Sequence, residues 1–161
     1  MPYSESSIVM DVLLLCIGRL KSPWVATGCA MYLQRLSSRC RLREIPASRE
    51  RDNSRQREDE SKRILDAADR ERGSVLWVLD ERGEGLSSRY FAQAIEKFSD
   101  RGTSLVVLLG GAYGFTDTVR ARAQKVLQLS AMTLPHELCR LLFLEQLYRA
   151  QEILRGGHYH H

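Results

Sequence analysis

The sequence lacks an apolar run long enough to cross a membrane, which takes roughly 18 residues. Its first apolar run, IVMDVLLLCIG, is interrupted by Asp11 and followed by Arg19 and Lys21. The first eleven residues hold neither lysine nor arginine, unlike a secretory signal or a transit peptide. We therefore expect a protein with no membrane partner, located in the cytoplasm.

Metal-binding motifs are also missing. The cysteines are far apart and show no C-x-x-C spacing, which argues against a zinc ribbon and a thioredoxin-like motif. The C-terminal RGGHYHH places His158, His160 and His161 on a glycine-tethered tail, with no rigid frame for a metal ion. We expect no metal, and free thiols that are buried or half-buried at Cys16, Cys29, Cys40 and Cys139.

Positive charge is in excess and unevenly distributed. The 161 residues carry a net charge of +4, yet ten basic and only three acidic residues lie between Arg19 and Arg57. This stretch is either a solvated basic face or a footprint for a polyanion such as RNA. Because no aromatic residue lies between Arg35 and Arg57, it predicts contact with phosphates rather than stacking on bases.

Apolar runs that alternate with helical patterns predict a single α/β domain over residues 1–161, with a mainly parallel sheet flanked by helices. Nearly continuous runs such as SVLWVLD and SLVVLLGG are typical of strands buried on both faces. We expect strands over residues 8–17, 40–46, 74–80, 104–111 and 126–132. Helices are expected after Ser22, around residues 64–68, and over 88–99, 116–124 and 135–154. The polar stretch 47–60 is expected to be a mobile loop.

In open parallel sheets, ligands bind at the carboxyl ends of the strands. Unusual residues follow several of these ends: Leu79 with Asp80, the glycines of GGAYG (110–114), and the segment 130–134. GGAYG matches neither G-x-G-x-x-G nor a Walker A sequence, so it is either a tight turn or a place where a ligand meets the backbone. His136 and Arg140 then share one face of the last helix, as site residues or as a capping histidine and an exposed arginine.

The last predicted helix is apolar on more than one side. Its apolar positions include Leu138, Leu141, Leu142, Leu144, Leu147 and Tyr148. A helix that is apolar on several sides needs a second packing partner. We therefore predict a homodimer.

Separated segments of the chain together resemble a known family. VLDERG, LLGGAYGF, LSAMTLPHELCRLLFLEQLYRA and the C-terminal YHH occur in an order and spacing similar to the ribosomal RNA large subunit methyltransferase H family. The similarity runs from about Leu14 to the end and is strongest from Leu105 onward. Members are SPOUT-class proteins that methylate N3 of a pseudouridine in large-subunit (23S) rRNA. The resemblance implies a C-terminal trefoil knot, a homodimer, a large-subunit rRNA or ribosome partner, and S-adenosylmethionine as cofactor.

The resemblance also assigns roles to residues. The catalytic candidates are His136, Arg140, Tyr159 and His160, with none singled out as the base. By analogy the tail that carries Tyr159 and His160 reaches the substrate site of the partner protomer. The glycine loop has no positive charge of its own, which suits a cofactor without phosphate. The implied cofactor contacts are Leu79, Gly110, Leu129, Ser130, Ala131, Met132, Thr133 and Leu134.

Two other functions stay open. A non-catalytic RNA- or ribosome-binding module of the same fold would use the basic stretch between Arg35 and Arg57. A nucleotide-binding enzyme would use GGAYG for phosphates, although that loop has no lysine.

Overall fold

The computed structural model describes residues 10–160. These residues form a sheet with the strand order β2-β1-β4-β3-β5, and all neighbouring strands are parallel. The predicted parallel α/β sheet is therefore confirmed. The strands are β1 (Val12–Ile17), β2 (Cys40–Ile45), β3 (Val75–Gly85), β4 (Leu105–Leu109) and β5 (Lys125–Gln128).

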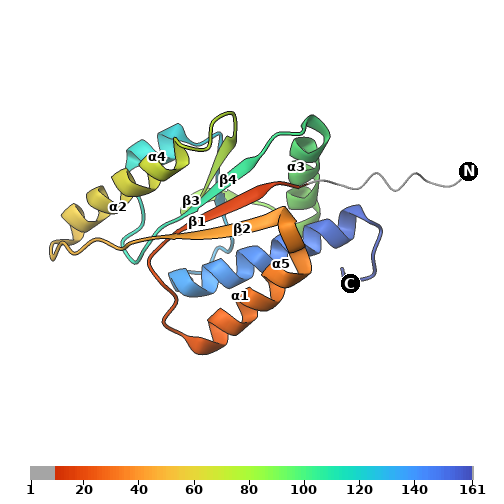
Figure 1. The fold of residues 1–161 in the computed structure, drawn as a ribbon, viewed down its shortest axis with the longest axis horizontal. Coiled ribbons are helices and arrows are strands. Elements are labelled where there is room, and N and C mark those ends of the chain that lie inside the picture. Colours follow the sequence, from red (N-terminus) through yellow and green to blue (C-terminus); the bar gives the residue numbers. More distant parts are fainter. Residues whose placement is uncertain (1–9, 161) are drawn as a thin grey trace, which may run out of the picture.

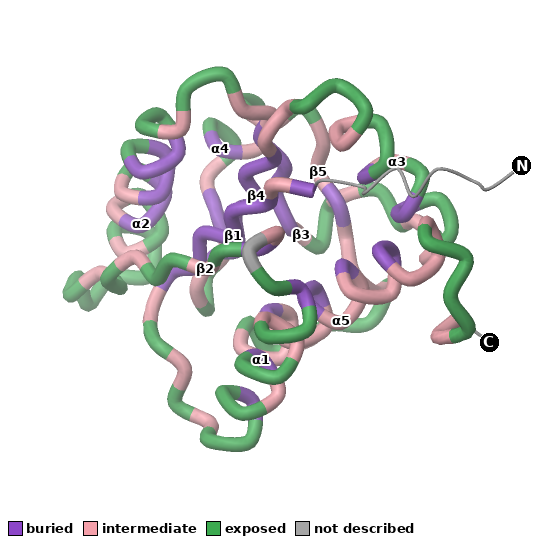
Figure 2. Tube along the Cα trace, turned by 45° about the vertical axis from the view of Figure 1, so that its right-hand side comes forward, coloured by how far each residue is buried: buried purple, intermediate pink, exposed green. Residues whose placement is uncertain are grey.

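Helices cover both faces of the sheet (Figure 1). Leu14 and Cys16 of β1 face the core that contains Phe143, whereas Leu15 faces the core that contains Ile64. Side chains alternate across a strand, so burial on both faces explains why the strands read as continuous apolar runs. Figure 2 shows these buried strands in the middle of the molecule. The first core is covered by α1 (Pro23–Leu36), α3 (Ser88–Arg101) and α5 (His136–Leu154), and the second by α2 (Asn53–Ala68) and α4 (Asp117–Arg122); a 3-10 helix, η1 (Ser37–Arg39), precedes β2.

The expectation of a mobile loop over residues 47–60 is wrong for its second half. Helix α2 begins at Asn53, where the carboxylate of Asp52 accepts a hydrogen bond from the amide of Arg55. The early part of this helix is polar even where it is buried, because Glu60 and Ser61 form hydrogen bonds to neighbouring segments. Hydrophobic periodicity could not detect such a helix.

Strand β3 also extends further than expected. It continues past Asp80 to Gly85, with an irregularity in register, and its last residues pair with β5. Strand β5 is correspondingly short, and residues 129–134 leave the sheet as a loop. The backbones come very close here: a Cβ on Gly83 would lie 2.5 Å from the carbonyl carbon of Leu127. Only glycine fits this crossing. The threading of a trefoil knot stays a prediction.

The thiols behave as expected. Cys16, Cys29 and Cys40 are buried, Cys139 is half-buried, and all are free. Burial raises the pKa of Cys16 and of Cys40 to about 12, so both thiols stay protonated at neutral pH. The start of the first predicted strand, residues 8–9, lies outside the described residues. Within the described part of the chain, no helix is long and apolar enough to span a membrane.

Candidate active site

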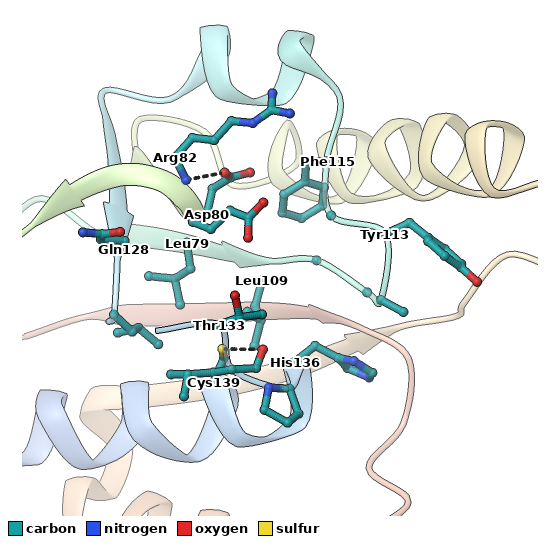
Figure 3. Close-up of a pocket in the computed structure, with 18 of the residues that line it drawn as sticks. Leu79, Asp80, Arg82, Leu109, Tyr113, Phe115, Gln128, Thr133, His136 and Cys139 are labelled. Atoms are coloured by element: carbon teal, nitrogen blue, oxygen red, sulfur yellow. Dashed lines mark hydrogen bonds between the residues drawn. The ribbon is translucent and has the colours of Figure 1, made fainter. Parts of the chain in front are cut away.

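The carboxyl ends of β3, β4 and β5 converge on one cavity of about 510 Å³ (Figure 3). This volume is typical of a small-molecule site. The walls come from residues 79–82, 109–115 and 128–136, with single residues added from α2, α4 and α5. Parallel strands end at the same edge of the sheet, so segments about 50 residues apart in the chain meet here. The position predicted from the sequence is the position of the cavity.

The structure gathers the expected cofactor residues around this cavity. Ala131 belongs to the same loop and is exposed, but it does not line the cavity. The loop is shaped by hydrogen bonds, including one of 2.9 Å from the amide of Met132 to the hydroxyl of Ser130. The expected residues that do line the cavity are Leu79, Gly110, Leu129, Ser130, Met132, Thr133 and Leu134.

The glycine loop is a tight turn packed against α2. The amide of Gly114 donates to the carbonyl of Gly111 at 3.1 Å, and Gly114 has a φ of 68°. A Cβ on Gly110 would lie 3.3 Å from the ring of Phe115, so a larger side chain would have to turn toward the cavity or displace that ring. Behind the loop, the buried carboxylate of Glu60 would lie 2.8 Å from a Cβ on Gly111. The two readings of GGAYG are therefore compatible: the loop is a turn, and it exposes backbone to the cavity.

An ion pair that the sequence did not reveal connects two walls of the cavity. Arg120 of α4 donates to the carboxylate of Asp80 at 2.9 Å and to the carbonyl of Phe115 at 2.9 Å. Both charged side chains are largely buried, with exposed fractions of 16% for Arg120 and 8% for Asp80. Arg120 also pairs with Asp117; this contact is the main cause of the raised pKa of Arg120 and of the lowered pKa of Asp117.

The glycine loop itself carries no positive charge, but Arg57, Arg82 and Arg120 reach the cavity from other segments. None of these arginines lies in the glycine loop, so inspecting that loop alone could not find them. The one signal in the sequence was Asp80, a carboxylate at the end of a buried strand. Such a group requires a partner.

The two catalytic candidates on α5, His136 and Arg140, lie in different environments. His136 is exposed and lines the cavity, whereas Arg140, one turn later, does not line it. Arg140 is only 2% exposed, so the alternative of an exposed arginine is wrong. Its guanidinium donates to the carbonyl of Gly18 at 2.9 Å and pairs with Glu44 at 3.4 Å. Arg140 thus fixes the start of α5 against the ends of β1 and β2, and thereby positions His136.

Tyr159 and His160 lie near the opposite end of α5. The hydroxyl of Tyr159 is 3.3 Å from the carboxylate of Glu145, and the guanidinium carbon of Arg149 lies 4.8 Å from the centre of its ring. A ring nitrogen of His160 is 3.4 Å from Arg149. Helix geometry places Arg149 roughly 20 Å along α5 from His136. In this structure, the tail of the chain therefore lies away from the cavity of the same chain.

The C-terminal tail makes polar and aromatic contacts through Tyr159 and His160. Burial is the first cause of the raised pKa of Tyr159, followed by its hydrogen bond with Tyr32 and by the charge of Glu145. The hydrogen bond with Glu145 is the main reason that the pKa of Arg149 is raised. Sequence reasoning missed Glu145 and Arg149, although their i, i+4 spacing on the last helix was a usable signal.

Comparison with known proteins identifies this architecture. The sequence model of a family described as "Predicted SPOUT methyltransferase" matches residues 10–160. The chain belongs to the SPOUT methyltransferase family. Among its relatives named ribosomal RNA large subunit methyltransferase H, the one from Trichlorobacter lovleyi is 41% identical over 155 residues, covering 94% of this chain and 100% of the relative. The one from Prochlorococcus marinus strain MIT 9303 is 42% identical over 147 residues, covering 91% of this chain and 90% of the relative.

Solved structures agree with the SPOUT assignment at the level of the fold. A "Probable Methyltransferase" from Bordetella pertussis Tohama I has a TM-score of 0.59 at 15% identity, covering 89% of this chain and 96% of that one. A "probable methylase family protein" from Haemophilus influenzae Rd KW20 has a TM-score of 0.60 at 12% identity, covering 95% of this chain and 71% of that one. The family model over residues 10–160 and the relatives of about 40% identity confirm the expected SPOUT family, and these structures support the fold. Across the described residues, no group of three or more His, Cys, Asp or Glu side chains is arranged to hold a metal ion.

Proposed function

We propose that this SPOUT methyltransferase transfers a methyl group from S-adenosylmethionine to large-subunit ribosomal RNA, at N3 of a pseudouridine. The observation that carries the proposal is the convergence of three strand ends on one cavity, in a chain similar over its whole described length to relatives named for rRNA methylation. The partners and the location that we propose follow from it: large-subunit rRNA or the ribosome, in the cytoplasm, with residues 1–161 acting as one domain.

The cavity fits this cofactor in its chemistry. Leu79, Leu129 and Leu134 offer apolar walls for the adenine ring, and the glycine loop offers backbone groups that no side chain blocks. S-adenosylmethionine, when bound, supplies a methyl group that its sulfonium already activates. The task left to the protein is to hold the loops in place and to align the acceptor. Arg120 and Asp80 do the first by joining two of the three walls.

The acceptor side of the site requires a second copy of the chain. His136 is the catalytic candidate at the cavity of its own chain, whereas Tyr159 and His160 follow α5 and contact Arg149, far from His136. In the homodimer that we propose, the tail of one protomer completes the cavity of its partner. Arg149 would arrive with that tail, because it contacts both tail residues. A fixed cation near the acceptor favours loss of the N3 proton.

The decisive experiment uses labelled S-adenosylmethionine and ribosomes that lack their own modification. We expect one methylated position in the large-subunit rRNA, mapped as N3 of a pseudouridine. Failure of the folded protein to bind S-adenosylmethionine in calorimetry at micromolar concentration would refute the proposal. Gly110→Val should lower cofactor affinity at least tenfold, with circular dichroism as the check on folding.

The alternative is a non-catalytic RNA-binding module with the same fold. The exposed basic residues between Arg35 and Arg57 favour it. Stable binding to ribosomes with no methyl transfer, under conditions where the cofactor is bound, would select this alternative.

A further inference from the structure

Exposed arginines lead to the mouth of the cavity. Arg49 and Arg51 lie before α2, Arg55 and Arg57 lie in its first two turns, and all are exposed. Arg57 also lines the cavity. Within the described residues, none of these side chains forms an ion pair, although the charge of Arg57 contributes to the lowered pKa of Asp117. Their guanidinium groups can therefore pair with an external anion.

The segment that carries these arginines is fixed against the glycine loop. The buried carboxylate of Glu60 accepts a hydrogen bond of 3.0 Å from the amide of Ser48. The hydroxyl of Ser61 accepts one of 3.0 Å from the amide of Thr116, at the end of the glycine loop. Arginines on such a rigid element lose little conformational freedom when a ligand binds, apart from that of their own side chains.

An aromatic side chain lies at the same mouth. Tyr113 of the glycine loop lines the cavity and is 44% exposed. Figure 3 shows its ring directed away from the centre of the cavity, toward the outside. Tyr113 and Arg57 line the same cavity and are both exposed. An exposed ring and an exposed guanidinium group at one site suit single-stranded RNA, because bases stack on the ring and phosphates pair with the guanidinium group.

We propose that Arg55, Arg57 and Tyr113 bind the single-stranded RNA that flanks the methylated nucleotide, and thereby guide that nucleotide into the cavity. The arginines contact phosphates, and the ring of Tyr113 stacks on a neighbouring base. This inference rests on the proposed function and adds a substrate-binding surface to it. It also changes the expectation from the sequence, in which the basic stretch contacts phosphates without any stacking partner.

The arginines are tested by fluorescence anisotropy with a labelled single-stranded RNA. The double variant Arg55→Ala/Arg57→Ala should bind about tenfold more weakly, and its dependence of log affinity on log salt should be shallower by roughly 1.4. The matched control is Arg70→Ala/Arg72→Ala, which removes the same charge from exposed positions beyond the other end of α2. The control should stay within about twofold of wild type. Equal losses in the two double variants would overturn the proposal.

Tyr113 is tested in the same assay. Tyr113→Ala should weaken binding about fivefold or more, because a stacked base contributes roughly 1–3 kcal/mol. Tyr113→Phe keeps the ring and should bind like wild type. Affinity for S-adenosylmethionine, measured by calorimetry on the same variant, separates stacking from loop shape. Tyr113→Ala should lose more affinity for RNA than for the cofactor, and equal losses would show that the residue only shapes the loop. Duplex RNA bound as tightly as single-stranded RNA, or binding of Tyr113→Ala at wild-type strength, would contradict stacking.

The outcomes separate this inference from the proposed function. If wild type methylates rRNA and the variants bind RNA as well as wild type does, the inference fails and the function stands. If the variants lose RNA binding while wild type transfers no methyl group, the function fails and the surface stands. Binding to vesicles of anionic lipid that depends on Arg55 and Arg57, without comparable binding to RNA, would overturn the choice of partner.

Discussion

Replacing Gly83 by alanine tests the crossing of β3 and β5 that shapes the cavity. A Cβ there would lie 2.5 Å from the carbonyl carbon and 2.7 Å from the amide nitrogen of Leu127. Ordinary contacts of this kind are about 3.5–4 Å, so the backbone of β5 would have to move by roughly 1 Å. Overpacking usually costs about 1–3 kcal/mol, and the obstacle here is backbone rather than a flexible side chain. We expect a loss of about 3 kcal/mol in the free energy of unfolding.

The control is Gly85→Ala in the same strand. The nearest atom to a Cβ on Gly85 is the side-chain nitrogen of Gln128 at 3.1 Å, at the end of a flexible side chain. This substitution should change the free energy of unfolding by less than about 1 kcal/mol.

Urea unfolding at equal protein concentration measures the difference between these variants. With a slope of about 2 kcal/mol per molar urea, the midpoint of Gly83→Ala should fall by about 1.5 M. Its affinity for S-adenosylmethionine should also fall, because the crossing lies between the walls that contain Leu79 and Leu129. Midpoints of the two variants within about 0.3 M of each other would refute the reasoning from close contact.

Three further changes test other parts of the structure. Arg140→Ala leaves a buried cavity and removes an ion pair, so urea unfolding should show a loss of about 3–5 kcal/mol, whereas exposed Arg70→Ala should show almost none. The pKa of Cys16 and of Cys40 is raised to about 12 in the folded chain, so unfolded chains release these protons from about pH 9 upward while folded chains keep them. The free energy of unfolding should therefore fall between about pH 9 and 12, by up to about 1.4 kcal/mol per pH unit for each thiol. The fall should be less steep in Cys16→Ala. Asp80→Asn should weaken cofactor binding measured by calorimetry, since it removes the charge that holds Arg120; unchanged affinity would mean that the two walls hold together without this pair.

The sheet was predictable because its strands are buried on both faces. Runs such as LLLCI in β1 and LVVLL in β4 are short and nearly continuous, which is typical of strands buried on both faces of a parallel sheet. The first half of α2 was not predictable from periodicity, because its buried positions are Glu60 and Ser61. Their burial is stabilised by hydrogen bonds from the amides of Ser48 and Thr116, which hydrophobic periodicity does not report.

The candidate site was predictable in position but not in its charges. Glycines and polar residues after buried strands indicate a ligand site, since parallel strands end at one edge. Arg57 and Arg120 come from helices, so only the packed structure shows that they reach this edge. The distance between His136 and the tail residues likewise depends on α5 running unbroken as one helix.

The strand order has a consequence for how the protein is made. Strand β4 lies between β1 and β3, which do not pair with each other, so the two halves of the sheet stay separate until Leu105–Leu109 have been synthesised. The last wall of the cavity follows β5, and α5 then covers the sheet. The cavity that we propose for the cofactor is therefore incomplete during most of translation, because its last wall, residues 128–136, is among the last segments to be synthesised.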